Sequence, residues 1–365
     1  MRSLISIRAW RSVLVALVAV FALAGLAACG TGAPEPVSTE EAPDTAAEAT
    51  GELIVYSSRN ERFVDPLLEK FSADTGIEVR TLHAGDTVVN KLVEEASRPL
   101  ADIVIANDIG MLEHLRLNGI LTSPGAVDGI DSIEDRFRAV DDSWVALSAR
   151  TRVFIYNKDL ITEEEMPTTV WELTDPKWDG MFAITRGGNS GMIGHVSALR
   201  NEWGDEQTEE WIEAVKDNAG AITEGHGDIR RAVGAGEFAF GLVNNYYYHQ
   251  QLREPEDNNV GVIYPDQGAD EMGAVVNAAG VGVVAGGPNE VSTRIFLEWL
   301  LLPENQREFS FASLEVPVNP EIEAVEEARP ISDYRIQGMP LSELGEVWED
   351  TRSLIERAGL DMELR

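Results

Sequence analysis

Short apolar runs alternate with stretches of helical spacing along most of the chain. Residues 53–56 form a β-prone run, and apolar residues from Phe63 to Phe71 then recur three and four positions apart, as on one face of a helix. Gly76 is placed to end that helix, and residues 77–82 alternate as a second strand. This β-α-β order predicts a parallel sheet with helices packed against it.

The alternation continues through the rest of the chain. Apolar and polar positions predict strands over 101–108, 144–157, 180–185 and 238–243, and helices over 88–96, 111–119, 190–204, 211–220, 227–236 and 291–311. The pattern predicts an α/β fold, in which ligands lie beyond the carboxyl ends of strands. Three adjacent tyrosines, Tyr246, Tyr247 and Tyr248, follow one such strand, which favours a binding site over a packed core.

The N-terminus predicts export. Residues 1–28 combine three arginines with an apolar run that is slightly short for a membrane span, as in a secretory signal peptide. Residues 26–29, "LAAC", resemble a bacterial lipobox, in which Cys29 becomes the lipid-modified N-terminus of the mature protein. Cys29 is the single cysteine, which excludes a disulfide within the chain. Residues 29–51 are small, acidic and Pro-containing, and predict a flexible tether.

Size and charge limit the partners of the body that follows. About 310 residues remain, which suggests two lobes. The formal net charge of −34 argues against nucleic acid and anionic membrane surfaces as partners. The acidic excess is also typical of a solubilised surface in a salt-adapted organism, so it does not by itself predict a cationic ligand.

Motifs of common enzyme classes are missing from the sequence. It has no G-x-S-x-G, P-loop, H-E-x-x-H or Rossmann glycine fingerprint, and its five histidines are scattered. We therefore expect a protein without catalytic activity.

The order of several short motifs resembles a known family. The runs "VYSSRN", "ADIVIAND", "SARTRVFIYN", "DPKWDGMFAI", "VNNYYY" and "EVPVNP" follow one another between about residue 52 and the C-terminus. Together they resemble the ferric-iron-binding proteins of bacterial ABC importers, the bacterial transferrins. The resemblance implies a periplasmic-binding-protein type II fold, with two α/β lobes joined by a hinge and a ligand cleft between them.

The resemblance also implies domain boundaries and a function. Lobe 1 is expected over 52–150, completed by about 277–327, and lobe 2 over 151–276, completed by about 328–365. A monomeric, lipid-anchored receptor on the extracytoplasmic face of the membrane would capture Fe3+ and deliver it to an ABC permease. The alternative is a receptor of the same fold for a small organic ligand such as thiamine, a polyamine or a phosphonate.

Within the resemblance, Tyr246 and Tyr247 match the adjacent iron-binding tyrosines, and Tyr248 is expected to pack. Fe3+ is a small, hard cation that prefers anionic oxygen donors, and a phenolate is such a donor. Because a phenol has an ordinary pKa near 10, the metal must displace its proton. Adjacent tyrosines also occur in aromatic cores and in platforms that stack a sugar or heterocycle, so the residues alone leave these readings open.

A second element, "RGGNSGMIGH", lies before a predicted helix, whose free backbone N–H groups can bind an anion. In one branch of the family a synergistic anion, phosphate or carbonate, completes the coordination of iron at this place. The matching residues are Ser190, Gly191 and Met192, with Asn244 assisting. The same string is also compatible with an ordinary helix cap.

The sequence departs from the family at two ligand positions. Asn60 stands where members often have a histidine, and Asn107 where they often have a glutamate. An Asn carbonyl brings no charge and is a poorer donor for Fe3+. Asn60 and Asn107 are therefore weaker candidate metal ligands, and Asp108, next to Asn107, could substitute. His226 falls near a position where the family has an anion-contacting Asn, and could bind the anion or the metal.

Other polar residues have less specific roles. Arg150 and Arg152 could neutralise the anion or form salt bridges between strands. His249 is expected to support the tyrosines rather than bind the metal.

Overall fold

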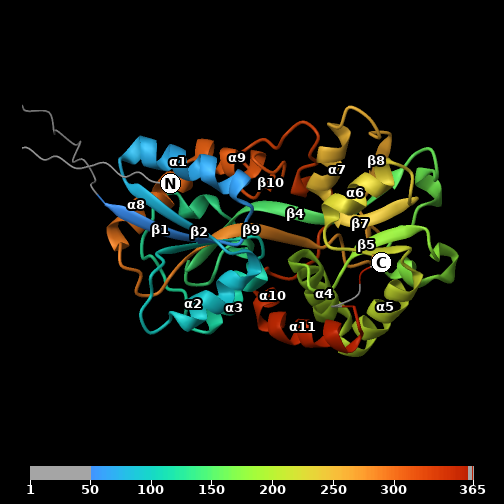
Figure 1. Ribbon diagram of the computed structural model, residues 1–365, viewed down its shortest axis with the longest axis horizontal. Helices are drawn as coiled ribbons and strands as arrows, with labels where there is room; N and C mark the ends of the chain where they lie inside the picture. Colours follow the sequence, from blue (N-terminus) through green and yellow to red (C-terminus); the bar gives the residue numbers. More distant parts are fainter. Residues whose placement is uncertain (1–50, 361–363, 365) are drawn as a thin grey trace, which may run out of the picture. The chain divides into compact units, whose positions relative to one another are not determined.

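The longest strand of the computed structural model, β4 (Trp144–Asn157), is buried along its whole length and lies at the centre of the sheet (Figure 1). The structure describes residues 51–360 and 364, and within them ten strands form one sheet in the order β2-β1-β3-β9-β4-β7-β5-β6, with β8 and β10 also paired to β4. The first half of β4 pairs with β9 and β10, and the second half pairs with β7 and β8. One strand thus joins the two parts of the sheet.

The remaining elements alternate along the chain as the sequence predicts. The strands are β1 (Glu52–Ser57), β2 (Glu78–His83), β3 (Ile103–Ala106), β5 (Phe182–Thr185), β6 (Ala221–Thr223), β7 (Phe240–Asn244), β8 (Val260–Ile263), β9 (Val276–Val283) and β10 (Val316–Pro317). The helices are α1 (Glu61–Thr75), α2 (Val88–Glu94), α3 (Ile109–Leu117), α4 (Ser190–Trp203), α5 (Asp205–Asn218), α6 (His226–Gly234), α7 (Asn245–Leu252), α8 (Glu290–Leu300), α9 (Pro303–Phe311), α10 (Glu343–Glu346) and α11 (Trp348–Arg357).

The first β-α-β unit forms as predicted. Strands β1 and β2 are parallel, and α1 between them buries one apolar face against the sheet. Asn60 caps the start of α1, because its side chain accepts the backbone N–H of Arg62. Gly76 ends the helix with a φ of 76°, a left-handed conformation that glycine adopts at little cost.

Several elements were not predicted from the sequence. Strand β6 has only three residues, and α7 carries polar and aromatic side chains without an apolar stripe. The C-terminal helices α10 and α11 were not predicted from the sequence either. Helix α10 packs on α3 so closely that a Cβ at Gly345 would lie 2.4 Å from Cβ of Glu113, while α11 contacts α3, α4 and α5 (Figure 1).

The α/β prediction is confirmed, whereas the lobe boundaries stay a prediction. The described residues of the body all fall within one compact unit, Glu48–Arg365. The predicted signal peptide, Cys29 and all of the tether except Gly51 lie outside the described residues. No helix in the described part of the chain is both long and apolar enough to cross a bilayer.

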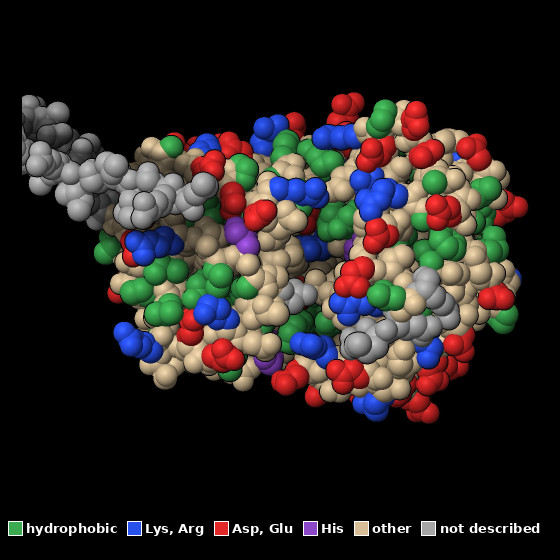
Figure 2. Space-filling model, viewed as in Figure 1, with side chains coloured by type: hydrophobic (Ala, Val, Ile, Leu, Met, Phe, Trp, Pro, Cys, Tyr) green, Lys and Arg blue, Asp and Glu red, His purple; other side chains and the backbone are tan. Residues whose placement is uncertain are grey.

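Acidic side chains are spread over the face drawn in Figure 2, with Lys and Arg side chains among them. This agrees with the strongly negative charge of the sequence and shows no extended basic surface on that face. The distribution is that expected of a solvated surface.

The loop between β8 and β9 is held by a buried carboxyl group. Asp266 is 4% exposed, and its Oδ2 accepts the backbone N–H of Val170 at 3.2 Å. Burial raises the pKa of Asp266 from 3.8 to about 7, and the nearby Glu271 and Glu172 add to the rise against the opposing effect of the Val170 N–H. The free energy of unfolding therefore falls as the pH rises from 3.8 to about 7, and the loss is complete above that range.

Asp266→Asn is expected to stabilise the protein at pH 8 and to have little effect at pH 4. The amide keeps an acceptor for Val170 but carries no charge, so the gain can reach about 4 kcal/mol above the folded pKa and vanishes below the unfolded one. Urea unfolding at several pH values measures this gain. Asp270→Asn, an exposed position in the same loop, is the matched control. A gain that does not depend on pH would contradict the assignment.

Candidate functional site

The three tyrosines lie in the first turn of α7, directly after β7. The rings of Tyr246 and Tyr247 have centroids 4.4 Å apart and planes 33° from parallel. All three side chains are half-buried, and Tyr247 and Tyr248 pack on a small apolar cluster of β4, β5 and β7. The packing expected of Tyr248 is present, and the neighbouring pair is part of neither the deep core nor the open surface.

Tyr247 holds its proton strongly in the metal-free protein. The pKa of Tyr247 is raised well above its ordinary value, first by the neighbouring Tyr246, then by burial and by a hydrogen bond to Tyr246. Arg150 acts in the opposite direction, and Glu315 adds to the rise. A ligand that needs the phenolate must therefore displace a firmly bound proton.

A buried arginine lies beside the tyrosine pair. The register of β4 and β7 places Arg152 opposite Asn244, and its Nη1 donates to Asn244 Oδ1 at 3.1 Å and to His226 Nε2. Burial lowers the pKa of Arg152 to about 9, while Tyr246 and Tyr247 act to raise it. Arg152 thus remains charged at neutral pH, next to the oxygens that would bind a cation.

His226 is the first residue of α6 and is buried. Its ring meets the Tyr247 ring nearly edge-on, with centroids 5.2 Å apart. Because a guanidinium group can only donate, Nε2 of His226 is the acceptor and the imidazole is neutral. Burial, followed by Arg152, lowers the pKa of His226 well below its usual range. As a metal ligand through Nε2, His226 would have to exchange its bond with Arg152.

The predicted anion-binding turn lies at the start of α4, next to the same arginine. A Cβ at Gly191 would lie 3.0 Å from Cε1 of His226 and 3.5 Å from Nη1 of Arg152. Two of the backbone N–H groups are already used, because Gly191 donates to Asn189 Oδ1 and Met192 to Asn189 O. The structure therefore brings Gly191 and Asn244 together at Arg152, while Met192 is fully buried in the core. Ser190 is half-buried at the head of the helix.

Asn107 and Asp108 directly follow the end of β3 and border the site on another side. Asn107 donates its backbone N–H to Ser58 Oγ and its side-chain Nδ2 to Ser58 O, both at 3.0 Å. Asp108 caps α3 through the N–H of Met111 at 3.0 Å and accepts Asn277 Nδ2 at 2.6 Å. Both carboxylate oxygens of Asp108 thus have structural partners.

Asn60 is not among the residues that line the pocket described next. Its Oδ1 accepts the backbone N–H of Arg62 and caps the start of α1. The capping contact accounts for this residue without a metal.

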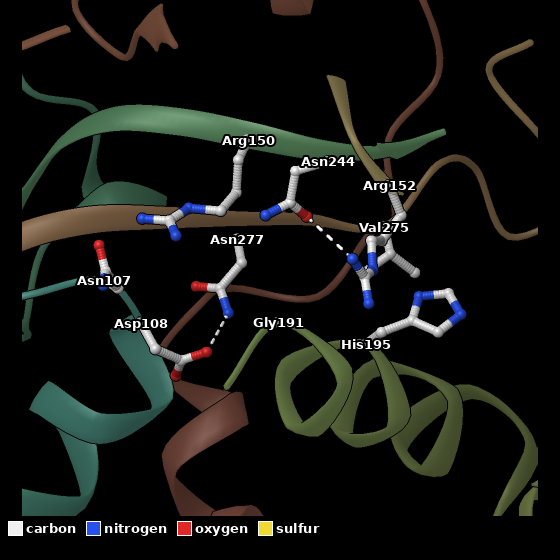
Figure 3. A pocket seen from close by; sticks show the side chains of 9 residues that line it. All are labelled: Asn107, Asp108, Arg150, Arg152, Gly191, His195, Asn244, Val275 and Asn277. Carbon is white, nitrogen blue, oxygen red and sulfur yellow. Dashed lines mark hydrogen bonds between the residues drawn. The ribbon is translucent and has the colours of Figure 1, made fainter. Parts of the chain in front are cut away.

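Some of these residues border a small pocket, whereas Tyr246, Tyr247, His226 and Ser190 are not among its lining residues (Figure 3). Its lining is Asn107, Asp108, Arg150, Arg152, Gly191, His195, Asn244, Val275 and Asn277. His195 and Asn277 were not predicted from the sequence. A signal for His195 was available, because it follows Gly191 by four positions on a helix and so shares its face.

A buried ion cluster supports Arg150. Glu315 accepts Nη1 and Nη2 of Arg59 at 3.1 and 3.2 Å, accepts the hydroxyl of Ser148, and lies 3.5 Å from Nη2 of Arg150. Burial alone would raise the pKa of Glu315, but the two arginines and Ser148 lower it. Glu315 is therefore ionised and is shared between two cations.

The backbone between the two pocket arginines is tied to the tyrosine helix. Thr151 donates its N–H to Asn245 Oδ1 at 3.1 Å, and its hydroxyl lies 2.6 Å from the Tyr334 hydroxyl in the C-terminal segment. Asn245 directly precedes the tyrosine pair. This link fixes α7 relative to β4.

A conventional metal cluster is missing from the part of the chain that the structure describes. Residues 51–360 and 364 contain no group of three or more His, Cys, Asp and Glu side chains placed to hold a metal. A cation at this site would therefore depend on the phenol oxygens and on groups that the ligand brings with it.

Comparison with known proteins gives consistent matches. A family model described as bacterial extracellular solute-binding protein matches residues 67–334. Iron uptake protein A1 of Synechocystis sp. is 28% identical over 343 residues, 92% of this chain and 92% of that protein. A Trichodesmium protein (IdiA, FutA) solved in complex with iron and citrate ligands is 28% identical, with a TM-score of 0.74 over 85% of this chain and 100% of that one. Iron-bound HitA from Pseudomonas aeruginosa is 25% identical, with a TM-score of 0.78 over 85% and 99%.

Tyr246→Phe is expected to lower the pKa of Tyr247 toward its ordinary value near 10, because the neighbouring phenol is the largest cause of the rise. Ultraviolet titration of tyrosinate absorbance in the metal-free protein measures the change. Tyr248→Phe is the control and should leave the titration of Tyr247 in place. An unchanged titration in Tyr246→Phe would show that the two rings are not coupled.

Proposed function

The chain belongs to the family of bacterial extracellular solute-binding proteins, and from this premise we propose that it captures ferric iron for an ABC importer. The observation that carries the proposal is the pair of half-buried phenols, Tyr246 and Tyr247, with ring centroids 4.4 Å apart beside the charged Arg152. Relatives named for iron uptake and ferric iron binding support it. The protein then delivers the ion to the permease and carries out no catalysis.

The predicted fold agrees with this proposal. Solved neighbours that are periplasmic and ferric-ion-binding proteins align over most of the chain, which confirms the periplasmic-binding-protein type II fold. We further propose that the mature protein is a monomer held at the extracytoplasmic face of the membrane by a lipid on Cys29.

Two phenolates suit a trivalent cation for electrostatic reasons. Each contributes one negative charge through a hard oxygen, so the bound Fe3+ retains one positive charge. Asp108 and the Nε2 atom of His226 are already engaged in hydrogen bonds, which leaves coordination positions open for a synergistic anion. We propose that this anion, phosphate or carbonate or a group of similar charge, lies between Arg152, Gly191 and Asn244, with Ser190 at the rim.

The double variant Tyr246→Phe/Tyr247→Phe is expected to lose the orange-red charge-transfer band that ferric tyrosinate gives. Iron affinity should fall by more than about a hundredfold, since this change removes ligands rather than their supporting partners. Titration with ferric nitrilotriacetate followed by visible absorbance measures both quantities, and Tyr248→Phe should keep the band. A parent protein that stays colourless and retains an organic molecule through purification would favour the organic-ligand receptor instead.

Iron affinity is also expected to fall steeply as the pH falls. Each phenol must lose a proton to bind, so two displaced protons reduce the apparent affinity by about a hundredfold per pH unit well below the phenol pKa values. Competition with a chelator whose own pH dependence is known gives the slope. A variant with one tyrosine replaced should show about half of the logarithmic slope, and an equal slope in parent and variant would exclude paired phenolate ligands.

A further inference from the structure

His249 donates its hydrogen bond to a turn outside α7. It lies two residues after Tyr247 and is fully buried, and its Nδ1 lies 2.9 Å from the carbonyl oxygen of Leu314. Because a carbonyl only accepts hydrogen bonds, Nδ1 carries the proton. The other ring nitrogen, Nε2, is buried without a hydrogen bond, which favours the neutral ring. The Nδ1–H group of His249 is thus committed to one backbone carbonyl.

The turn that His249 contacts is strained. Leu314 has a φ of 63°, in the left-handed region that a bulky side chain rarely adopts. It follows the end of α9, and its N–H donates to Phe311 O at 3.2 Å. The next N–H, that of Glu315, donates to Ser310 O at 3.0 Å. These two bonds form a Schellman motif, in which the left-handed residue is usually glycine. A leucine in that position needs support from its surroundings, and the contact with His249 supplies it.

The residue after this turn is Glu315, the buried carboxylate of the ion cluster. Its Oε2 accepts Nη1 of Arg59 at 3.1 Å, and its Oε1 lies 3.5 Å from Nη2 of Arg150. The direction in which the chain leaves Leu314 therefore decides how closely the carboxylate approaches Arg150. If Leu314 relaxed to a negative φ, the chain would leave in another direction and Arg150 would lose part of its compensation.

Helix α7 contacts the arginine segment from a second point on the same face. Asn245, four residues before His249, accepts the backbone N–H of Thr151, the residue directly after Arg150. Residues four apart lie on one face of a helix. That face therefore contacts the chain next to Arg150 through Asn245 and the chain next to Glu315 through His249. The tyrosine pair lies between these two contacts in the sequence.

We propose that His249 is a positioning residue for the proposed iron site. Its hydrogen bond to Leu314 O fixes the Glu315 carboxylate relative to the tyrosine helix, and so sets the positive charge that Arg150 presents to the ligand. This inference rests on the proposed iron-binding function. Binding of Fe3+ brings in three positive charges and releases two phenol protons, so the site gains one positive charge. A less compensated Arg150 would then weaken the binding of the cation.

Amide hydrogen exchange of the metal-free protein tests the contact itself. In His249→Leu, which removes the donor, the amide of Glu315 should exchange about tenfold faster than in the parent, because the turn loses one hydrogen bond. His249→Asn, whose amide N–H lies at about the position of Nδ1, should keep the slow exchange. His114→Leu on α3, where the ring contacts Trp348, is the matched control. Unchanged exchange in His249→Leu would overturn the inference.

A second substitution separates positioning from general destabilisation. His249→Leu is expected to weaken ferric iron binding about tenfold, measured by competition with nitrilotriacetate in buffer without phosphate or carbonate. Adding Leu314→Gly should restore most of this affinity, because glycine adopts the left-handed conformation without support. The double variant should nevertheless be no more stable to urea than His249→Leu, since it also loses a partly buried leucine side chain. A double variant that binds iron no better than His249→Leu would contradict the positioning role.

The two proposals fail in different ways. If the parent gives no ferric tyrosinate band with any anion, the iron function fails, and the exchange of the Glu315 amide still decides whether His249 holds the turn. If the band forms and His249→Leu binds iron as tightly as the parent, iron binding stands and the positioning inference falls.

Discussion

The constraint on which the site depends is the burial of two positive charges on one strand. Arg150 and Arg152 sit in the middle of β4, where each would be strongly unfavourable without compensation. Glu315 compensates Arg150 only in part, since it also binds Arg59. Arg152 has only neutral hydrogen-bond partners, Asn244 and His226. The site therefore carries positive charge that is only partly compensated, and the phenols of Tyr246 and Tyr247 lie close enough to Arg152 to raise its pKa.

The partly compensated positive charge of the arginines couples them electrostatically to the tyrosines. Arg150 lowers the pKa of Tyr247, whereas Tyr246 and Glu315 raise it. The Tyr247 phenol is thus kept protonated when the site is empty, and under the proposed function a bound cation would displace that proton. Electrostatic compensation of this kind favours a ligand that carries both signs of charge over a bare cation or a bare anion.

The sequence predicted the parts of the site that depend on local order. The strand before the tyrosines, the helix that begins at Ser190 and the extended run containing the arginines all have a clear local pattern. The sequence could not predict contacts such as that between Asn277 and Asp108, which are 169 positions apart, or between Arg59 and Glu315, which are 256 apart. The contact with Asn277 occupies one carboxylate oxygen of Asp108, whose other oxygen caps α3 through Met111. No local signal predicts that Glu315 binds Arg59 and lies beside Arg150. Helix α7 escaped prediction because its polar and aromatic residues show no apolar periodicity.

The link from Thr151 to Asn245 and Tyr334 has a mechanical consequence. Thr151 stands between Arg150 and Arg152, and Asn245 stands next to the tyrosines proposed to bind the metal, so one residue is tied to both parts of the proposed site. Under the proposed function, moving β4 against α7 would separate the groups proposed for the anion from those proposed for the cation, so the release of the two would be coupled.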